Sequence, residues 1–320
     1  MTSAAVACSV LAALLLGLDD PWWAALTAWV VSNEHRQALW SKGVQRLLGT
    51  VIGLALGLAV APMVAGLPVL QLVLLFAIGT VATRQRFASV HGYGWLYCGI
   101  TMMMVVMQSA ATPYGLLAFA QWRALEILTG VVVATLVSAV LGGPIAADIA
   151  AARGAAPATV ERPAALRQVA LIGGLLPVLV MVTWQAFDVP QVVQMAVTAI
   201  VVLDKDVTQQ GLRGRQRLLG CALGAACGIA VVLVGTDSLM LWLGALTIGV
   251  FLFSTIHHGG GPSAYVGTQA GVAFIIAIVS GSGPPDMLLP ALDRLAGVVL
   301  GVCLILLAGA LTTPARASRT

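Results

Sequence analysis

The chain has 320 residues, of which 60% are hydrophobic and 9% are charged, and its formal net charge is +4. Soluble globular domains carry about 25% charged residues, so this chain has too few charges to cover a water-facing surface. The composition therefore excludes soluble enzymes, nucleic-acid-binding proteins and secreted disulfide scaffolds. It predicts an all-α, polytopic transmembrane helical bundle, because 35 glycines and 6% aromatic residues suit helix packing in lipid better than a β-barrel.

Apolar runs follow one another along the chain, separated by charges or by glycine and proline. Six lie near 3–18, 21–32, 44–62, 67–83, 93–110 and 123–143, and six more near 166–187, 190–203, 215–235, 239–256, 263–281 and 292–312. One membrane-spanning helix takes about 20 residues. We therefore predict about twelve spans in two six-helix repeats, residues 1–143 and 166–320, with a cytoplasmic linker at 144–165 and a short cytoplasmic tail.

The two halves are copies of one unit. A shift of 171 residues places Ala25–Val60 on Ala196–Val231, with about sixteen identities in roughly 36 gapless positions. The same shift places Arg123 on Arg294. Because six is an even number of spans, both copies insert in the same orientation, and we expect a pseudo-twofold axis along the membrane normal.

Fourteen of the sixteen Lys and Arg residues fall on one side of the predicted membrane. By the positive-inside rule this side is the cytoplasmic one, so both termini are expected in the cytoplasm. The compact duplicated form points to the inner membrane of a bacterium. The two exceptions to the rule are Arg123 and Arg294, which begin the last predicted helix of each half.

Two segments, 22–32 and 190–203, are too short to cross a hydrocarbon core of about 30 Å at about 1.5 Å per residue. Short segments at matching positions of two repeats often mark transport sites. Thr27 and Thr198 occupy equivalent positions in these segments and offer hydroxyl groups to a ligand. The alternative is an ordinary tilted helix, in which each threonine bonds its own backbone.

Basic residues precede a glycine stripe in both halves. Lys42 and Arg46 lie one helical turn apart, as do Arg213 and Arg217. Each pair leads into overlapping GxxxG motifs, which let a neighbouring helix approach closely; these glycines are Gly49, Gly53, Gly57, Gly220, Gly224 and Gly228. We interpret each helix as running near the interface between the halves, with its basic residues forming a cytoplasmic vestibule for anions. The alternative is that they are topology residues whose side chains reach the membrane surface.

Arg123 and Arg294 oppose the positive-inside trend and match across the repeat, so we place them at the outer exit of a substrate path. Glu126 lies one turn after Arg123 and is the acid best placed to carry a coupled proton. Burial disfavours its charged form, whereas the neighbouring arginine favours that form. The alternative is a structural ion pair at the outer ends of the helices.

The sequence predicts no metal site, no cofactor and no enzyme activity. The five cysteines fall in apolar stretches and none forms a CxxC pair. Neither GxxxxGK[ST] nor HExxH occurs, so ATP hydrolysis by this chain is not the expected energy source.

The stretches Trp23–Ala28 and Lys42–Gly53, together with the run Arg123-x-x-Glu126-x-x-x-Gly130, resemble the fusaric acid resistance and aromatic acid exporter family. That wider group includes the plant aluminium-activated malate channels as distant relatives. The resemblance implies paired six-helix units around a central path, with carboxylate-bearing or aromatic small molecules as substrates. The second half departs from the first in having Gly297 at the position that matches Glu126.

We therefore expect a secondary transporter that exports organic carboxylate anions, aromatic acids among them, along a path between the two repeats. A passive organic-anion channel on the same scaffold is the alternative, and the scarcity of acids within the membrane favours it. A membrane scaffold without transport activity is a third interpretation. The expected partners are a small organic anion and the lipid bilayer, with no nucleic acid; the sequence leaves the substrate and the oligomeric state open.

Overall fold

A computed structural model describes residues 1–33, 35–142, 163–189, 192–204, 207–235, 238–279, 281, 283 and 289–312. Twelve α-helices and one 3₁₀ helix, η1 (Pro113–Gly115), make up the regular structure of these residues. The helices fall on the predicted apolar runs, which confirms the all-α fold class. Most of the predicted linker at 144–165 lies outside the described residues.

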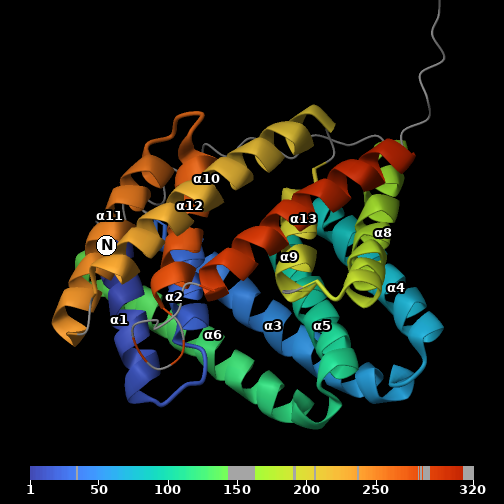
Figure 1. The fold of residues 1–320 in the computed structure, drawn as a ribbon, viewed down its shortest axis with the longest axis horizontal. Coiled ribbons are helices and arrows are strands. Elements are labelled where there is room, and N and C mark those ends of the chain that lie inside the picture. Colours follow the sequence, from blue (N-terminus) through green and yellow to red (C-terminus); the bar gives the residue numbers. More distant parts are fainter. Residues whose placement is uncertain are drawn as a thin grey trace, which may run out of the picture.

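Each half contributes six α-helices (Figure 1). Those of the first half are α1 (Thr2–Leu15), α2 (Pro21–Val31), α3 (Arg36–Val64), α4 (Pro68–Ala88), α5 (Gly92–Ala111) and α6 (Leu116–Leu141). Those of the second half are α8 (Pro163–Phe187), α9 (Val192–Val202), α10 (Val207–Val234), α11 (Leu239–His258), α12 (Ala264–Ile278) and α13 (Leu289–Thr312).

By length and composition, seven helices of the described chain can cross a membrane: α3, α4, α5, α6, α8, α10 and α11. The polytopic membrane bundle is thereby confirmed. Helices α2 and α9 have 11 residues each and extend roughly 16 Å. They are the two short segments that the sequence singled out, and both lie near the centre of the molecule (Figure 1).

Two helices begin earlier than their apolar runs. Helix α3 begins at Arg36, because polar side chains in a first turn do not stop a helix although they interrupt a hydrophobic run. Helix α6 begins at Leu116, with an apolar first turn that lies ahead of the predicted run. Arg123 consequently lies about two turns inside α6, and the prediction that it begins this helix is wrong. Arg46 lies almost three turns inside α3.

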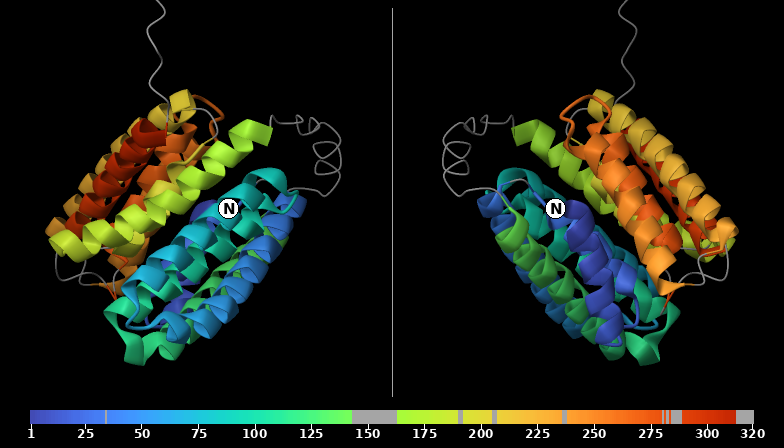
Figure 2. Two further views of the ribbon diagram at one scale, coloured as in Figure 1. Left: turned by 90° about the vertical axis from the view of Figure 1, so that its right-hand side faces the viewer. Right: turned by 90° about the vertical axis from the view of Figure 1, so that its left-hand side faces the viewer.

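The contacts between the halves occur in symmetric pairs. Helix α1 packs against α11 at one edge of the molecule and α4 against α8 at the other (Figure 1), while α2 meets α12 and α5 meets α9. Each contact appears twice with the two halves exchanged, as a twofold relation requires. Figure 2 shows the result as two layers of helices that face each other.

The glycine stripes pack within each half. A Cβ atom on Gly53 would lie 2.6 Å from the carbonyl oxygen of Cys98 on α5, and one on Gly220 would lie 2.5 Å from the carbonyl oxygen of Val266 on α12. The close approach expected at these glycines is thus made by a helix of the same half, because a GxxxG stripe specifies a close approach but not the helix that makes it.

Candidate functional site

A cavity of about 230 Å³ lies between the two halves. Its walls come from α2, α3, α5 and α6 of the first half and from α9, α10 and α12 of the second. Most of the lining side chains are apolar, and the polar ones are Arg46, Tyr97, Thr101, Arg123, Arg217, Tyr265, Thr268 and Gln269. Sites for drug-sized ligands measure roughly 300–1,000 Å³, so this cavity suits a smaller compound.

On the first-half side, Arg46 reaches from α3 to the short helix α2. Its side chain is 3% exposed, and Nη2 donates a hydrogen bond of 3.3 Å to Oγ1 of the fully buried Thr27. Gly130 on α6 permits this arrangement, because a Cβ there would lie 2.7 Å from Cβ of Thr27. Close packing of α2 against α6 thus sets the position of the hydroxyl group that holds the guanidinium.

The second half repeats this geometry. Arg217 on α10 is 4% exposed, and its Nη2 donates a hydrogen bond of 3.1 Å to Oγ1 of the buried Thr198 on α9. A Cβ on Gly301 of α13 would lie 2.8 Å from Cβ of Thr198. Both short helices therefore present a threonine to a buried arginine that lines the cavity.

The fifth helix of each half gives the two arginines different neighbours. The guanidinium carbon of Arg46 lies 3.8 Å from the ring centroid of Tyr97, whereas Nη1 of Arg217 donates a hydrogen bond of 2.6 Å to Oε1 of Gln269. Sequence reasoning missed both neighbours, because Tyr97 and Gln269 share no residue identity across the repeat. The sequence feature that could have pointed to this contact is Gln269 itself, because it is an amide side chain inside an apolar run.

Arg123 lines the same cavity and belongs to an ion-pair network. Its side chain is 5% exposed; Nη1 lies 2.9 Å from Oε2 of Glu126 and Nη2 lies 3.5 Å from Oδ2 of Asp20. The backbone N–H of Asp20 donates to the second oxygen of Glu126 at 2.9 Å. The guanidinium carbon of Arg123 lies 4.0 Å from the ring centroid of Trp23. The sequence assigned Arg46 and Arg123 to opposite ends of a path, whereas here both face one cavity.

Arg46 and Arg217 differ from Arg123 in having no acidic partner among the residues that the structure describes. The ion pairs found there belong to Arg123 and to Arg213. Nε of Arg46 and Nε of Arg217 are also buried without a hydrogen-bond acceptor in the described chain. A buried charge without a partner is costly, so the cavity carries positive charge that the surrounding side chains do not balance.

Two further predicted path residues, Arg213 and Lys42, do not line the cavity. Arg213 forms an ion pair with Asp204, in which Nη1 lies 2.8 Å from Oδ2, and its side chain is 40% exposed. Lys42 is half-buried on α3 and does not line the cavity. Arg294 lies on α13, but its side chain is outside the part of the chain that the structure describes.

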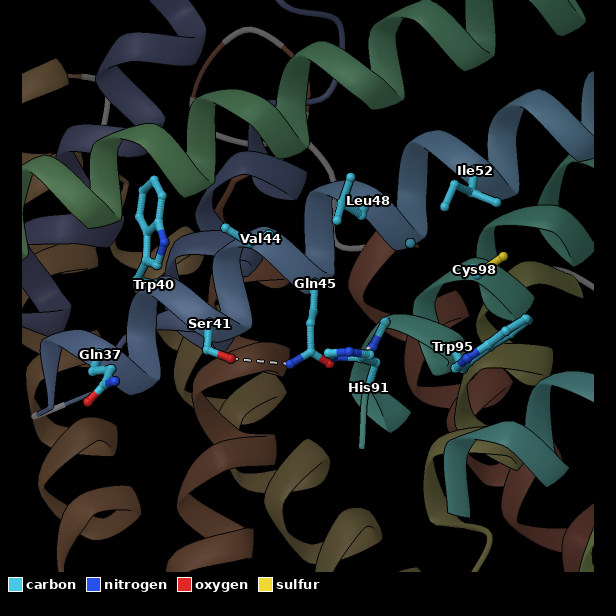
Figure 3. A pocket seen from close by; sticks show the side chains of 12 residues that line it. Gln37, Trp40, Ser41, Val44, Gln45, Leu48, Ile52, His91, Trp95 and Cys98 are labelled. Carbon is cyan, nitrogen blue, oxygen red and sulfur yellow. Dashed lines mark hydrogen bonds between the residues drawn. The ribbon is translucent and has the colours of Figure 1, made fainter. Parts of the chain in front are cut away.

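A larger cavity, of about 580 Å³, forms a groove between α3 and the start of α5 (Figure 3). Two of its lining side chains, Trp40 and Leu48, are 60% and 57% exposed, so the groove is on the outer surface of the bundle. Gln45 donates a hydrogen bond to Ser41 one turn away on α3, as the dashed line in Figure 3 shows, and its Oε1 accepts a hydrogen bond of 3.2 Å from the backbone N–H of Gly94 on α5. All of its residues come from the first half, and none is Arg or Lys. Its composition suits an apolar chain better than an anion.

Comparison with known families agrees with this architecture. The model of the fusaric acid resistance protein family matches residues 2–176, and that of the fusaric acid resistance protein-like family matches residues 158–310. The chain belongs to the fusaric acid resistance protein family. The resemblance in the motifs around Arg46 and Arg123 is thereby confirmed.

Curated relatives match part of the chain. An uncharacterized transporter of Gluconobacter oxydans is 31% identical over 134 residues, which are 39% of this chain and 18% of that protein. The p-hydroxybenzoic acid efflux pump subunit AaeB of Musicola paradisiaca is 28% identical over 141 residues, and that of Yersinia pestis strain Pestoides F is 29% identical over 143 residues. These two matches cover 41% and 40% of this chain and 22% of each relative. The chain thus matches about a fifth of each relative's length, and no solved structure matches it significantly.

Proposed function

We propose that the protein is a secondary transporter that exports small organic anions, aromatic carboxylates first among them, through the cavity between its two repeats. One observation carries this proposal: Arg46 and Arg217 are buried, face the cavity and have no carboxylate partner in the described chain. A bound carboxylate supplies the missing negative charge. A guanidinium group can bind it through two parallel N–H···O hydrogen bonds.

The relatives support the substrate class. Two of them are named as subunits of a p-hydroxybenzoic acid efflux pump, and p-hydroxybenzoate is a small planar carboxylate. The apolar walls of the cavity suit such a ring, and its arginines suit the carboxylate. The distribution of Lys and Arg supports a bacterial inner membrane with both termini in the cytoplasm. We propose the repeats as residues 1–143 and 166–320, joined by the linker at 144–165.

In this proposal the basic residues act in succession. Lys42 and Arg213 lie on the same helices as Arg46 and Arg217, nearer the cytoplasmic ends, and attract the anion by charge. Thr27 and Thr198 hold the two guanidinium groups in place. Arg123 and Arg294 are the basic residues on the path to the outer side.

Glu126 is the proposed site of proton coupling. It is fully buried and forms the ion pair with Arg123 on the cavity wall. Protonation of the carboxylate removes the negative charge beside Arg123 and so changes the charge that the anion meets. The binding of a proton to Glu126 and the binding of an anion in the cavity are therefore linked.

A passive anion channel is the second candidate, and one observation favours it. Both oxygens of Glu126 are already bound, one by Arg123 and one by the N–H of Asp20, as in a purely structural ion pair. The matching position of the second half is Gly297, which cannot carry a proton. A channel would pass anions down their gradient without regard to a pH gradient.

The deciding experiment measures the movement of p-hydroxybenzoate across proteoliposome membranes, with and without an imposed pH gradient. Uphill movement that stops when the gradient is collapsed indicates the coupled exporter. Downhill movement that ignores the gradient indicates the channel. If the anion does not move in either condition, the proposed function is wrong.

The double variant Arg46→Gln, Arg217→Gln tests the site. We expect its apparent KM for p-hydroxybenzoate to rise at least about tenfold, since charge-assisted hydrogen bonds are among the strongest in proteins. Arg215→Gln is the matched control, because Arg215 is exposed on α10 two residues from Arg217. An unchanged KM in the folded double variant would rule out the arginine site.

A further inference from the structure

The two arginine positions of the cavity are chemically unequal, although the repeat places them symmetrically. A Cβ atom on Gly49 would lie 3.2 Å from the backbone nitrogen of Cys98, and one on the matching Gly220 would lie 3.1 Å from the backbone nitrogen of Ala270. The residues just before them, Tyr97 and Gln269, therefore occupy equivalent positions. The asymmetry lies in this substitution of an aromatic ring by an amide and not in the placement of the arginines.

On the first-half side, Tyr97 occupies one face of the Arg46 guanidinium. Stacking on a ring holds the group through its face and leaves the N–H groups at its edge available. Within the described chain, Arg46 donates one hydrogen bond to another side chain, that to Thr27, and its Nε has no acceptor. The buried hydroxyl group of Tyr93 also interacts with this guanidinium, and Nε of Arg46 is the edge nitrogen left for a carboxylate.

On the second-half side, both terminal nitrogens of Arg217 are already bonded to neutral oxygens. Nη1 donates to Gln269 and Nη2 donates to Thr198. An anion at Arg217 has to compete with these bonds. Once its oxygen is bound by Arg217, the amide group of Gln269 still has two N–H donors, which suit a neutral oxygen such as a hydroxyl group.

Apolar side chains from both halves also line the cavity. Leu26 and Ile127 line the cavity from the first half, and Val197 and Val272 line it from the second. A planar ring fits between such side chains, whereas a second charge placed there would lose its hydration.

From this asymmetry we infer that Tyr97 and Gln269 are the specificity-determining residues of the cavity, which selects a monocarboxylate with a neutral hydrogen-bonding group at its far end. The carboxylate lies at Arg46 beside Tyr97, and the neutral group lies at Gln269 and Arg217. This inference rests on the proposed function. It disfavours dicarboxylates of the same length, because their second carboxylate reaches the terminal nitrogens of Arg217 only by displacing the hydrogen bonds to Gln269 and Thr198.

The test compares three probes of similar shape in proteoliposomes: benzoate, p-hydroxybenzoate and terephthalate. We expect the wild-type protein to prefer p-hydroxybenzoate over each of the other two by at least about tenfold in kcat/KM, since a site built to hydrogen-bond a hydroxyl group rejects analogues without it. Gln269→Met keeps the length of the side chain and removes the amide. It should bring the ratio of p-hydroxybenzoate to benzoate in kcat/KM close to one.

Variants of Tyr97 supply the second arm. Tyr97→Leu should lower the transport of all three probes by a similar factor, because the ring positions the arginine that every carboxylate uses. Tyr97→Phe keeps the ring and should lower transport less than Tyr97→Leu does. Size-exclusion profiles of the detergent-solubilised variants check that each is folded.

The outcomes separate this inference from the proposal on which it rests. If the wild-type protein moves none of the probes, both are wrong. If it moves them but accepts terephthalate as readily as p-hydroxybenzoate, the proposed function stands and the inference is overturned, even without a variant. An unchanged p-hydroxybenzoate to benzoate ratio in folded Gln269→Met also overturns it.

Discussion

Buried arginine side chains define the candidate site at the scale of single residues. Arg46, Arg123 and Arg217 are all at most 5% exposed, yet only Arg123 has carboxylate partners among the described residues. The difference assigns separate tasks to them. Arg123 is held by an ion-pair network that joins α6 to the start of α2, whereas the other two contact neutral side chains and have no carboxylate partner in the described chain.

The threonines provide the first residue-scale prediction. Replacing Thr27 and Thr198 by valine keeps the shape of the side chain and removes the acceptor of each arginine Nη2. A hydrogen bond to a charged group contributes about 1.5–3 kcal/mol, so we expect the apparent KM for p-hydroxybenzoate to rise roughly tenfold or more. The matched serine variants keep the hydroxyl groups and should retain the wild-type KM. Equal values for the valine and serine variants would contradict the role of the hydroxyl groups.

Glu126 provides the second prediction. Glu126→Ala removes a buried partner of Arg123, and breaking a buried ion pair costs about 3–5 kcal/mol, so the Tm of the purified protein should fall markedly. Glu126→Gln keeps an oxygen for the N–H of Asp20 and should lose less stability. Thermal unfolding in detergent measures both.

Transport by Glu126→Gln distinguishes the two proposed functions. In a proton-coupled exporter this folded variant no longer responds to an imposed pH gradient, because the amide cannot take up a proton. In a channel its response does not differ from that of the wild type. The two candidate mechanisms thus give opposite results with one protein.

At the scale of helices, the close pairs α3–α5 and α10–α12 position the site. The glycine stripes bring the fifth helix of each half against the third, and this contact places Tyr97 beside Arg46 and Gln269 beside Arg217. The short helices α2 and α9 place their threonines at the same level. Three helices of each half thus hold two buried charges in defined positions.

Substitution of a stripe glycine tests this arrangement. In Gly224→Val the new Cβ would collide with the backbone carbonyl group of Ala270, which cannot move without displacing α12. We expect a large loss of monodisperse protein in size-exclusion chromatography. Gly244→Val is the control, because a Cβ on this glycine of α11 would meet no atom within 4 Å. Similar behaviour of the two variants would show that close packing at the stripe is not required.

At the scale of the whole molecule, one arginine links the halves directly. Arg86 on α4 donates hydrogen bonds of 2.6 and 3.5 Å to the carbonyl oxygens of Ile200 and Val201, in the last turn of α9. Carbonyl groups at the end of a helix have no partner within the helix, and a cation there is favoured by the helix dipole. The first half therefore stabilises the short helix that carries Thr198 in the second.

Removal of this link should weaken the assembly of the two halves. Arg86→Met keeps the apolar stem and removes both hydrogen bonds, so we expect a lower Tm in detergent and a higher sensitivity of the chain to proteases. Arg84→Met is the control, since Arg84 is exposed on the same helix. If both variants melt at the wild-type temperature, the link does not contribute to stability.

The sequence by itself determined the membrane class, the duplication and several members of the site. Hydrophobic runs separated by charges specify helices in lipid whatever their partners are, and a constant offset reveals two copies of a unit. The same offset paired Arg46 with Arg217 and Thr27 with Thr198. These features depend on local chemistry and on repetition along the chain, and both can be recognised in the sequence without the tertiary structure.

Only the tertiary structure decided which residues meet. The stripe of Gly53 gives no indication that α5 of the same half is its partner, and the position of Arg123 along the chain does not show that it shares a cavity with Arg46. Tyr97 and Gln269 lie far from their arginines in sequence and differ between the repeats. Their contacts arise from the packing of helices that are distant along the chain, which is a property of the whole fold and not of any local pattern.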